Sequence, residues 1–248
     1  MPVAVRSSAT AEDLPDDHVQ RVLTAVFPVL PSTAPVAVAG FLMLGLARKV
    51  AGPDLDADAT HEVLRSLPHN VTPEMDLELW AGATRIRADA ASADALRGTP
   101  PSTLPPVLAR EVDGFLRRHG HRAVAEIDVG MPRWSDDPAY VLGVLANYLR
   151  LDDPDRAPDV RFARGARAAE AAVAGVVAAV RRRSRVRAAD VAFALGRTRQ
   201  LAGMRETHED FLVRLLAHAR AQLAVLGADL AGRGLLDAAD DVFFLDLP

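Results

Sequence analysis

The strongest constraint on the fold is a pair of long alanine-rich segments in the second half of the chain. Both repeat apolar residues every three or four positions, the spacing of one helix face. A polar, arginine-rich break near 182–187 separates them, and Gly232 and Gly234 end the second. This pattern predicts an antiparallel helical hairpin. The expected inner faces are Phe162, Ala166, Ala169, Val173, Val176 and Val180 in the first segment, and Val191, Leu195, Phe211, Leu215, Ala219, Leu223, Leu226 and Leu230 in the second.

The remainder of the chain also reads as helix. Helices are expected over 19–30, 36–50 and 107–119, from Thr72 with Pro73 at the first helical position, and from the Asp136-Asp137-Pro138 start. The fold class is therefore mainly α, with very little strand, near the N-terminus and at 241–245. Residues 19–248 are expected to form one helical domain. The proline-rich segment 98–106 is either a hinge within it or only a surface loop.

Composition limits the classes of function. Half of the 248 residues are hydrophobic, the formal net charge is −4, and cysteine is absent. A sizeable buried core is expected, whereas disulfides and thiol catalysis are excluded. Neither nucleic acid nor a membrane is an expected partner, because the net charge is negative and the most apolar run, 36–46, is too short to cross a bilayer. We expect a cytoplasmic protein.

The segment 121–138 is the longest stretch without a helical repeat of apolar residues. It contains several side chains that could take part in binding or catalysis. Glu126, Asp128, Arg133 and Trp134 are candidate binding residues. Arg133 is either a phosphate or carboxylate contact or a structural partner of Asp136 or Asp137, and Trp134 is either the wall of an apolar pocket or a core residue.

Two histidines precede these candidates. One interpretation is that His119 and His121 form a metal site or an acid/base cluster with Glu126 and Asp128. The alternative is that His119 is a cation that caps the C-terminus of a helix. The capping interpretation is favoured, because the spacing is not diagnostic of a metal site. No metal ligand and no catalytic residue are assigned.

The N-terminal run PVAVRSSATAEDLP (2–15) is a short strand, an arginine and a hydroxyl-rich turn. It resembles the ATP-grasp signature of phosphoenolpyruvate synthases, pyruvate phosphate dikinases and rifampin phosphotransferases. The resemblance implies that Arg6, Ser7, Ser8 and Thr10 contact the phosphates of ATP, with magnesium as a second cofactor in the intact family. Residues 1–18 are interpreted as a remnant of that signature. Neither cofactor is expected to bind tightly to this chain alone.

A second resemblance covers about residues 36–245. The strings AGFLMLGLARKVAG, SLPHNVTPEMDLELW, FLRRHGHRAVAEIDVGMPRWSDDP and DDVFFL are similar to the helical domain between the ATP-grasp and phosphohistidine domains of rifampin phosphotransferase-like enzymes. The resemblance implies a site for an acceptor such as a rifamycin, placed near Glu126, Asp128, Arg133 and Trp134.

The family's phosphohistidine motif is expected after DDVFFL, where the sequence has only three more residues. The interpretation is a truncated phosphotransferase-like protein that is inactive alone. The family enzyme transfers a phosphoryl group from ATP through a histidine and forms AMP. The alternative is a stand-alone helical module that binds a hydrophobic antibiotic-like ligand or docks onto a partner phosphotransferase. Separate polypeptides carrying the ATP-grasp and phosphohistidine domains are a further expected kind of partner.

Overall fold

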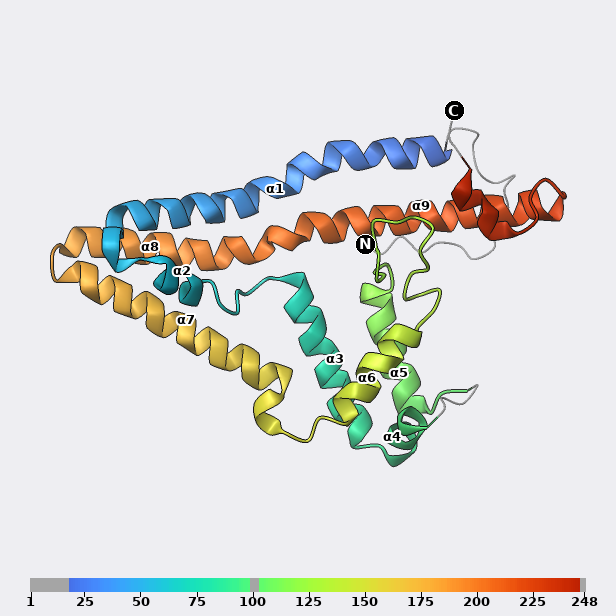
Figure 1. Cartoon of the computed structure of the whole chain (residues 1–248), viewed down its shortest axis with the longest axis horizontal. Coiled ribbons are helices and arrows are strands. Elements are labelled where there is room, and N and C mark those ends of the chain that lie inside the picture. The colour runs from blue at the N-terminus through green and yellow to red at the C-terminus, as the bar shows by residue number, and fades with distance from the viewer. Residues whose placement is uncertain (1–17, 99–102, 246–248) are drawn as a thin grey trace. The chain divides into compact units, whose positions relative to one another are not determined.

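The computed structural model describes residues 18–98 and 103–245, with side chains from residue 35 onward. The mainly α fold is confirmed, since no strand occurs in these ranges. The helices are α1 (His18–Ala51), α2 (Ala57–Val63), α3 (Val71–Arg87), α4 (Ala90–Arg97), α5 (Pro106–His119), α6 (Ala139–Leu149), α7 (Pro158–Arg181), α8 (Arg185–Ala202) and α9 (Thr207–Gly232), with short 3-10 helices at Gly52–Asp54, Pro154–Arg156, Gly203–Glu206 and Ala239–Phe244 (Figure 1).

The chain divides into two compact units, each made of several segments. Among the described residues, unit 1 comprises 18–31, 112–141 and 209–245, and unit 2 comprises 32–98, 103–111 and 142–208. Each unit is therefore built from segments that lie far apart in the sequence. The boundaries fall within α1, α5, α6 and α9, so these helices contribute residues to both units.

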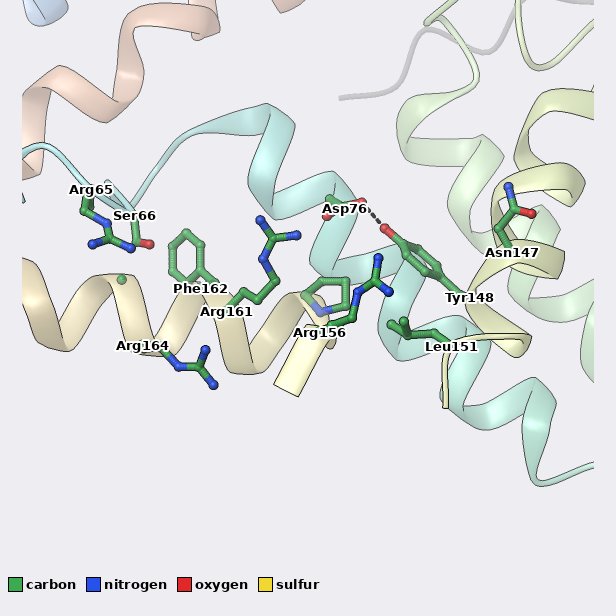
Figure 2. Close-up of a pocket in the computed structure, with 12 residues that line it drawn as sticks. Arg65, Ser66, Asp76, Asn147, Tyr148, Leu151, Arg156, Arg161, Phe162 and Arg164 are labelled. Carbon is green, nitrogen blue, oxygen red and sulfur yellow. Dashed lines mark hydrogen bonds between the residues drawn. The ribbon is translucent and has the colours of Figure 1, made fainter. Parts of the chain in front are cut away.

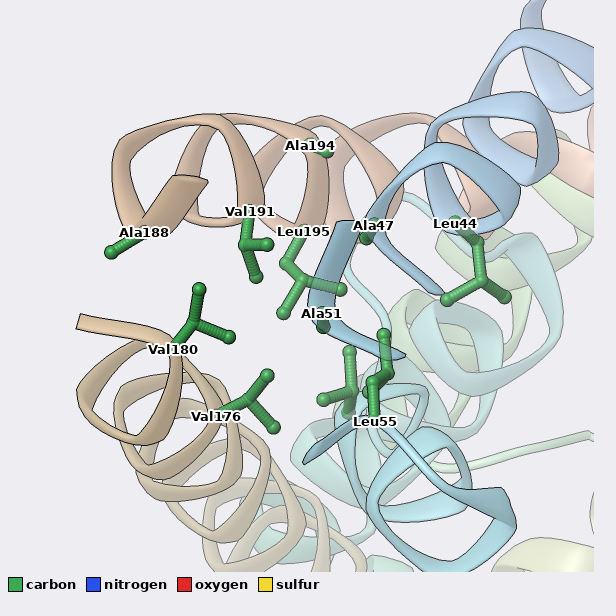
Figure 3. Close-up of a cluster of buried hydrophobic side chains, with 11 residues drawn as sticks. Leu44, Ala47, Ala51, Leu55, Val176, Val180, Ala188, Val191, Ala194 and Leu195 are labelled. Carbon is green, nitrogen blue, oxygen red and sulfur yellow. The ribbon is translucent and has the colours of Figure 1, made fainter. Parts of the chain in front are cut away.

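The core of unit 2 forms where the α7–α8 hairpin meets α2 and the last turns of α1 (Figure 3). The predicted hairpin is confirmed: α7 ends at Arg181, and α8 begins three residues after Arg182 with Ser184 as its cap, whose hydroxyl accepts from the Arg187 amide at 3.3 Å. The buried side chains are Leu44, Ala47, Ala51, Leu55, Val63, Val176, Val180, Ala188, Val191, Ala194 and Leu195. Four of these eleven are alanine, which allows the helices to approach closely.

Short polar side chains fix where the smaller helices of unit 2 begin. Asp56, Asn70 and Asp89 each accept a hydrogen bond from a backbone amide in the first turn of α2, α3 and α4. Such caps satisfy amides that have no partner inside the helix. Thr72, predicted to begin the helix, lies inside its first turn, because Asn70 occupies the cap position instead.

The segment at 241–245 corrects the sequence-based expectation. It is not a strand or an extended tail, because Ala239–Phe244 forms a 3-10 helix. The Ala238 amide donates to the Asp241 carboxylate at 2.8 Å, and Val242 packs against Gly227 of α9. A side-chain cap and one buried valine thus select a tight helical turn over the extended conformation that the aromatic run favours.

Two other expectations about helix length are wrong. Helix α1 continues through residues 31–35, where a break between two helices was predicted. The predicted second arm of the hairpin is interrupted by the 3-10 helix Gly203–Glu206, which separates α8 from α9. Gly203 explains the interruption, since a Cβ there would lie 1.8 Å from the Pro68 carbonyl oxygen and the backbones are in close contact.

Two stretches within the described ranges, Pro35–Asp54 and Arg185–Gly232, are long and apolar enough to cross a membrane by length and composition alone. Core helices of soluble proteins pass the same test, so this observation is weak. Residues 1–17 of the segment interpreted as an ATP-grasp remnant lie outside the described residues, as do residues 99–102 of the proline-rich segment.

Candidate functional site

The candidate site is the irregular segment 120–138 of unit 1, between α5 and α6. Its two ends are tied together, because the Trp134 amide donates to the Arg122 carbonyl at 2.8 Å and the Ser135 amide to the Gly120 carbonyl at 3.0 Å. Gly120 makes this closure possible, since a Cβ there would lie 2.4 Å from the Leu116 carbonyl oxygen and 3.0 Å from the Ser135 Cβ. The segment is therefore a closed loop with a defined conformation. We call it the 120–138 loop.

Arg133 holds the loop from inside. Its side chain is 2% exposed, and its guanidinium donates to the carbonyls of Glu126 at 2.8 Å and Asp128 at 3.2 Å. Burial, with the nearby positive charge of Arg220, lowers the pKa of Arg133. The guanidinium thus donates to the loop backbone, and the Asp136 carboxylate accepts from the Arg133 backbone amide, at 3.0 Å.

Arg220 fastens the same loop to α9. Its guanidinium donates to the carbonyls of Val129 at 3.0 Å and Gly130 at 2.8 Å, and pairs with Asp136 at 3.0 Å. The Phe243 ring lies 4.5 Å from the guanidinium carbon, a cation–π distance. Two buried arginines therefore supply the donors that a loop without secondary structure would otherwise lack.

Trp134 lies in a row of aromatic rings. Its ring stacks on Tyr140 with centroids 5.2 Å apart and on Phe115 at 6.1 Å, and Phe115 in turn lies 4.8 Å from His119. Trp134 is 7% exposed, so the row packs the C-terminal end of the loop onto α5 and the start of α6. Offset aromatic stacks add to the stabilisation that burial gives.

A charged network lies beneath the start of the loop. Asp210, near the start of α9, accepts from His121 Nε2 at 2.8 Å and from Arg214 Nε at 2.9 Å, and Arg122 Nη1 lies 3.5 Å away. Arg122 also forms an ion pair with Glu126 at 2.5 Å. The side chains of His121 and Asp210 are each only 10% exposed, so the network is largely shielded from solvent.

Burial and hydrogen bonding act differently on each member of this network. Burial lowers the pKa of His121, which favours the neutral imidazole with its Nε2 hydrogen directed at Asp210. For Asp210, burial acts to raise the pKa, but the hydrogen bonds from His121 and Arg214 outweigh it and leave the pKa well below its usual value. Burial raises the pKa of Glu126 despite Arg122. Two carboxyls in one cluster thus have pKa values shifted in opposite directions.

The outer surface of the loop carries aliphatic side chains, although charged side chains are buried beneath it. Val124 is 76% exposed and Ile127 is 72% exposed, while Arg133 is almost fully buried. Folded domains usually bury aliphatic side chains and expose arginine. The loop therefore presents two aliphatic side chains on a frame that its buried charges hold in place.

The structure brings together three of the four acceptor-binding candidates through the loop backbone: Arg133 donates to the carbonyls of Glu126 and Asp128. The Asp128 carboxylate accepts from the Gly130 amide at 2.8 Å, while Trp134 belongs to the aromatic row. Arg6, Ser7, Ser8 and Thr10 lie outside the described residues. Within the ranges that are described, no three His, Asp or Glu side chains are placed to share a metal ion.

Two residues central to the site, Asp210 and Arg220, were not among the sequence candidates. Both are buried in α9. The predicted inner face of this helix instead included Phe211, which is 39% exposed. The sequence did offer a sign of them: Asp210 directly precedes Phe211, and Arg220 directly follows Ala219, both on the predicted inner face. Helical periodicity assigned the face to apolar residues, whereas the loop requires charged partners there.

These features define a helical domain with a charge-clamped loop. The family model described as the rifampicin phosphotransferase fourth domain matches residues 31–206. The chain is 30% identical over 203 residues to a rifampicin phosphotransferase from Streptomyces sviceus, covering 77% of the chain and 23% of that protein. It is 28% identical over 109 residues to a rifampicin phosphotransferase from Bacillus subtilis, covering 40% of the chain and 13% of that protein.

The chain therefore belongs to the rifampicin phosphotransferase family. It spans about a quarter or less of the length of the curated relatives that it matches. The 120–138 loop lies inside the matched range, whereas Asp210 and Arg220, which hold it, lie beyond residue 206.

Proposed function

We propose that this chain is the acceptor-binding part of a phosphotransferase and that the 120–138 loop contacts a large apolar acceptor of the rifamycin type. The proposal rests on one observation: the 120–138 loop exposes the aliphatic side chains of Val124 and Ile127 and buries the charged side chain of Arg133. Exposed aliphatic side chains on a fixed frame are typical of a surface that binds an apolar ligand. The name of the family supplies the acceptor class.

In this proposal Arg133, Arg220 and Trp134 position the loop, and Val124 and Ile127 contact the acceptor. Glu126 is the candidate polar contact, because it lies between Val124 and Ile127 in the loop and its carboxylate is held there by the ion pair with Arg122. A preformed loop lowers the ordering cost of binding, which favours affinity for a rigid ligand.

We expect these residues by themselves not to transfer phosphate. The chain spans about a quarter of the Streptomyces relative. The family resemblance assigns the phosphohistidine and most of the ATP site to other parts of the enzyme. Acceptor binding is then the chain's own contribution, and phosphoryl transfer requires the ATP-grasp and phosphohistidine parts, from the same or another polypeptide. ATP-dependent labelling of the purified chain, with or without rifampicin, would contradict this expectation.

The binding test is a calorimetric titration with rifampicin and, separately, with ATP. We expect rifampicin to bind and ATP not to bind measurably. Replacing both Val124 and Ile127 by serine should weaken rifampicin binding by at least tenfold, because two aliphatic contacts are lost. Val186→Ser is the matched control, since Val186 is 73% exposed on α8 in unit 2. Unchanged affinity in the double variant, or equal loss in the control, would contradict the placement of the site.

A further inference from the structure

A second candidate binding site lies entirely within unit 2. A cavity of about 650 Å³ opens between the loop that follows α2, the start of α3, the end of α6 and the N-terminal turns of α7 (Figure 2). Four arginines line it, at positions 65, 156, 161 and 164, against a single acidic residue, Asp76. Neither the family match nor the resemblance of the sequence assigns a role to this cavity.

One wall of the cavity is fixed by close backbone packing. Ser66 adopts a left-handed conformation, with φ of 44°, and its hydroxyl lies directly over α7. Gly165 makes this approach possible, since a Cβ there would lie 2.2 Å from Ser66 Oγ. From α8, the guanidinium of Arg199 donates to the carbonyls of Arg65 at 3.0 Å and Ser66 at 3.3 Å. The backbone that carries Arg65 is therefore held before any ligand arrives.

The opposite wall is fixed by a second set of contacts. The Tyr148 hydroxyl donates to the Asp76 carboxylate, as the dashed line in Figure 2 shows. The Tyr148 ring meets Trp80 edge to face with centroids 5.5 Å apart, and Arg87 donates to the Tyr148 carbonyl at 2.6 Å. Asp76 is thus held by the tyrosine, and it is not paired with an arginine of the cavity.

The charges in the cavity are unevenly compensated. Arg65 pairs with Glu62 at 2.9 Å and Arg164 with Asp155 at 2.7 Å. Arg156 and Arg161 form no ion pair among the residues that the structure describes. In Figure 2 these two side chains extend from the start of α7, and from the turn before it, toward Asp76 and Tyr148, whereas Arg164 lies along the other edge of the helix.

Backbone dipoles reinforce this positive charge. Helix α7 begins at Pro158, which lines the cavity, and its first turn has no side-chain cap from the preceding residue. The N-terminus of a 24-residue helix carries a partial positive charge that favours anions. Asp159 in the same turn offsets part of it. Two guanidiniums without ion-pair partners and a helix N-terminus therefore converge on one preformed cavity.

We propose that this cavity binds a small phosphorylated ligand, with Arg156 and Arg161 as the main phosphate contacts. A planar guanidinium donates two parallel hydrogen bonds to phosphate, so two of them suit a group with at least two negative charges. Phe162 and Leu151 line the same cavity and give an apolar surface for the organic part of an ester. The site is separate in sequence and in unit from the 120–138 loop, so the two can bind independently.

The test is a calorimetric titration of the 248-residue chain with inorganic pyrophosphate and with phenyl phosphate at about 0.1 M salt. We expect both to bind at one site. Replacing Arg156 and Arg161 together by glutamine should weaken binding at least tenfold. Arg181→Gln with Arg182→Gln is the matched control, because it removes the same charge from the exposed end of α7. The control should keep its affinity within about twofold.

Three results of these titrations would overturn the proposal. Equal weakening in both double variants would mean that overall charge, and not the cavity, attracts the anion, and would overturn the proposal. Absence of binding by the unaltered chain, or tighter binding of citrate than of pyrophosphate, would overturn it too. Far-ultraviolet circular dichroism checks that the variants fold. Since the rifampicin titration of the Val124 and Ile127 variant uses another ligand and another unit, failure of one proposal leaves the other intact.

Discussion

Asp210→Asn is the substitution that most directly tests the charged network of unit 1. The Asp210 carboxylate accepts from His121 at 2.8 Å and from Arg214 at 2.9 Å, with Arg122 at 3.5 Å. Asparagine keeps the shape but removes the negative charge and turns one acceptor into a donor. One of the two hydrogen bonds is therefore lost, and its donor faces the new amide group.

The expected cost follows from the burial of each partner. A hydrogen bond to a charged group contributes about 1.5–3 kcal/mol, and a buried ion pair broken at one partner costs about 3–5 kcal/mol. Arg214 is 47% exposed, so solvent screens its share, whereas His121 is 10% exposed and Arg122 is 12% exposed. We expect a free energy of unfolding lower by about 2–4 kcal/mol. For a chain of this size that corresponds to a Tm lower by about 5–15 °C.

The assay is thermal and urea unfolding followed by circular dichroism at neutral pH. The control is Asp229→Asn, also in α9, which removes the partner of Arg233. The Asp229 side chain is 31% exposed and that of Arg233 is 64% exposed. An exposed pair of this kind contributes about 0.3–0.5 kcal/mol. If Asp210→Asn and Asp229→Asn lower the free energy of unfolding by the same small amount, the network does not stabilise unit 1 and the reasoning is wrong.

Three other predictions concern pH and packing. Because burial lowers the pKa of His121 in the folded state, the unfolded state binds more protons, so stability is complete above about pH 6.5 and falls as the pH drops below it; melting curves from pH 7.5 to 5 should show less of this fall in His121→Gln. Gly203→Ala should lower the free energy of unfolding by about 1–3 kcal/mol, because its Cβ would meet the Pro68 carbonyl, while Gly143→Ala, with open space around it, should be neutral or stabilising in the same melts. Leu195→Ala should cost about 2–5 kcal/mol by urea unfolding, and a cost below 1 kcal/mol would contradict its place in the core.

Local sequence pattern was enough to predict most of the helices. The apolar spacing in 159–180 predicted α7 and its turn to α8, and the Asp-Pro start at 137–138 predicted α6. The pattern failed where contacts from distant residues decide. The 241–245 segment reads as strand, but the Asp241 cap and the packing of Val242 on Gly227 make it a 3-10 helix.

Glycines, prolines and charges interrupt every helical period in residues 121–138, so the sequence alone predicted an irregular segment there. It also brought Glu126, Asp128, Arg133 and Trp134 forward as candidates. The folded structure was needed to show that the Arg133 guanidinium donates to loop carbonyls and that Asp210 and Arg220 of α9 hold the loop in place. The physical reason is that a buried polar group must find a partner, and helical periodicity does not encode which distant residue supplies it.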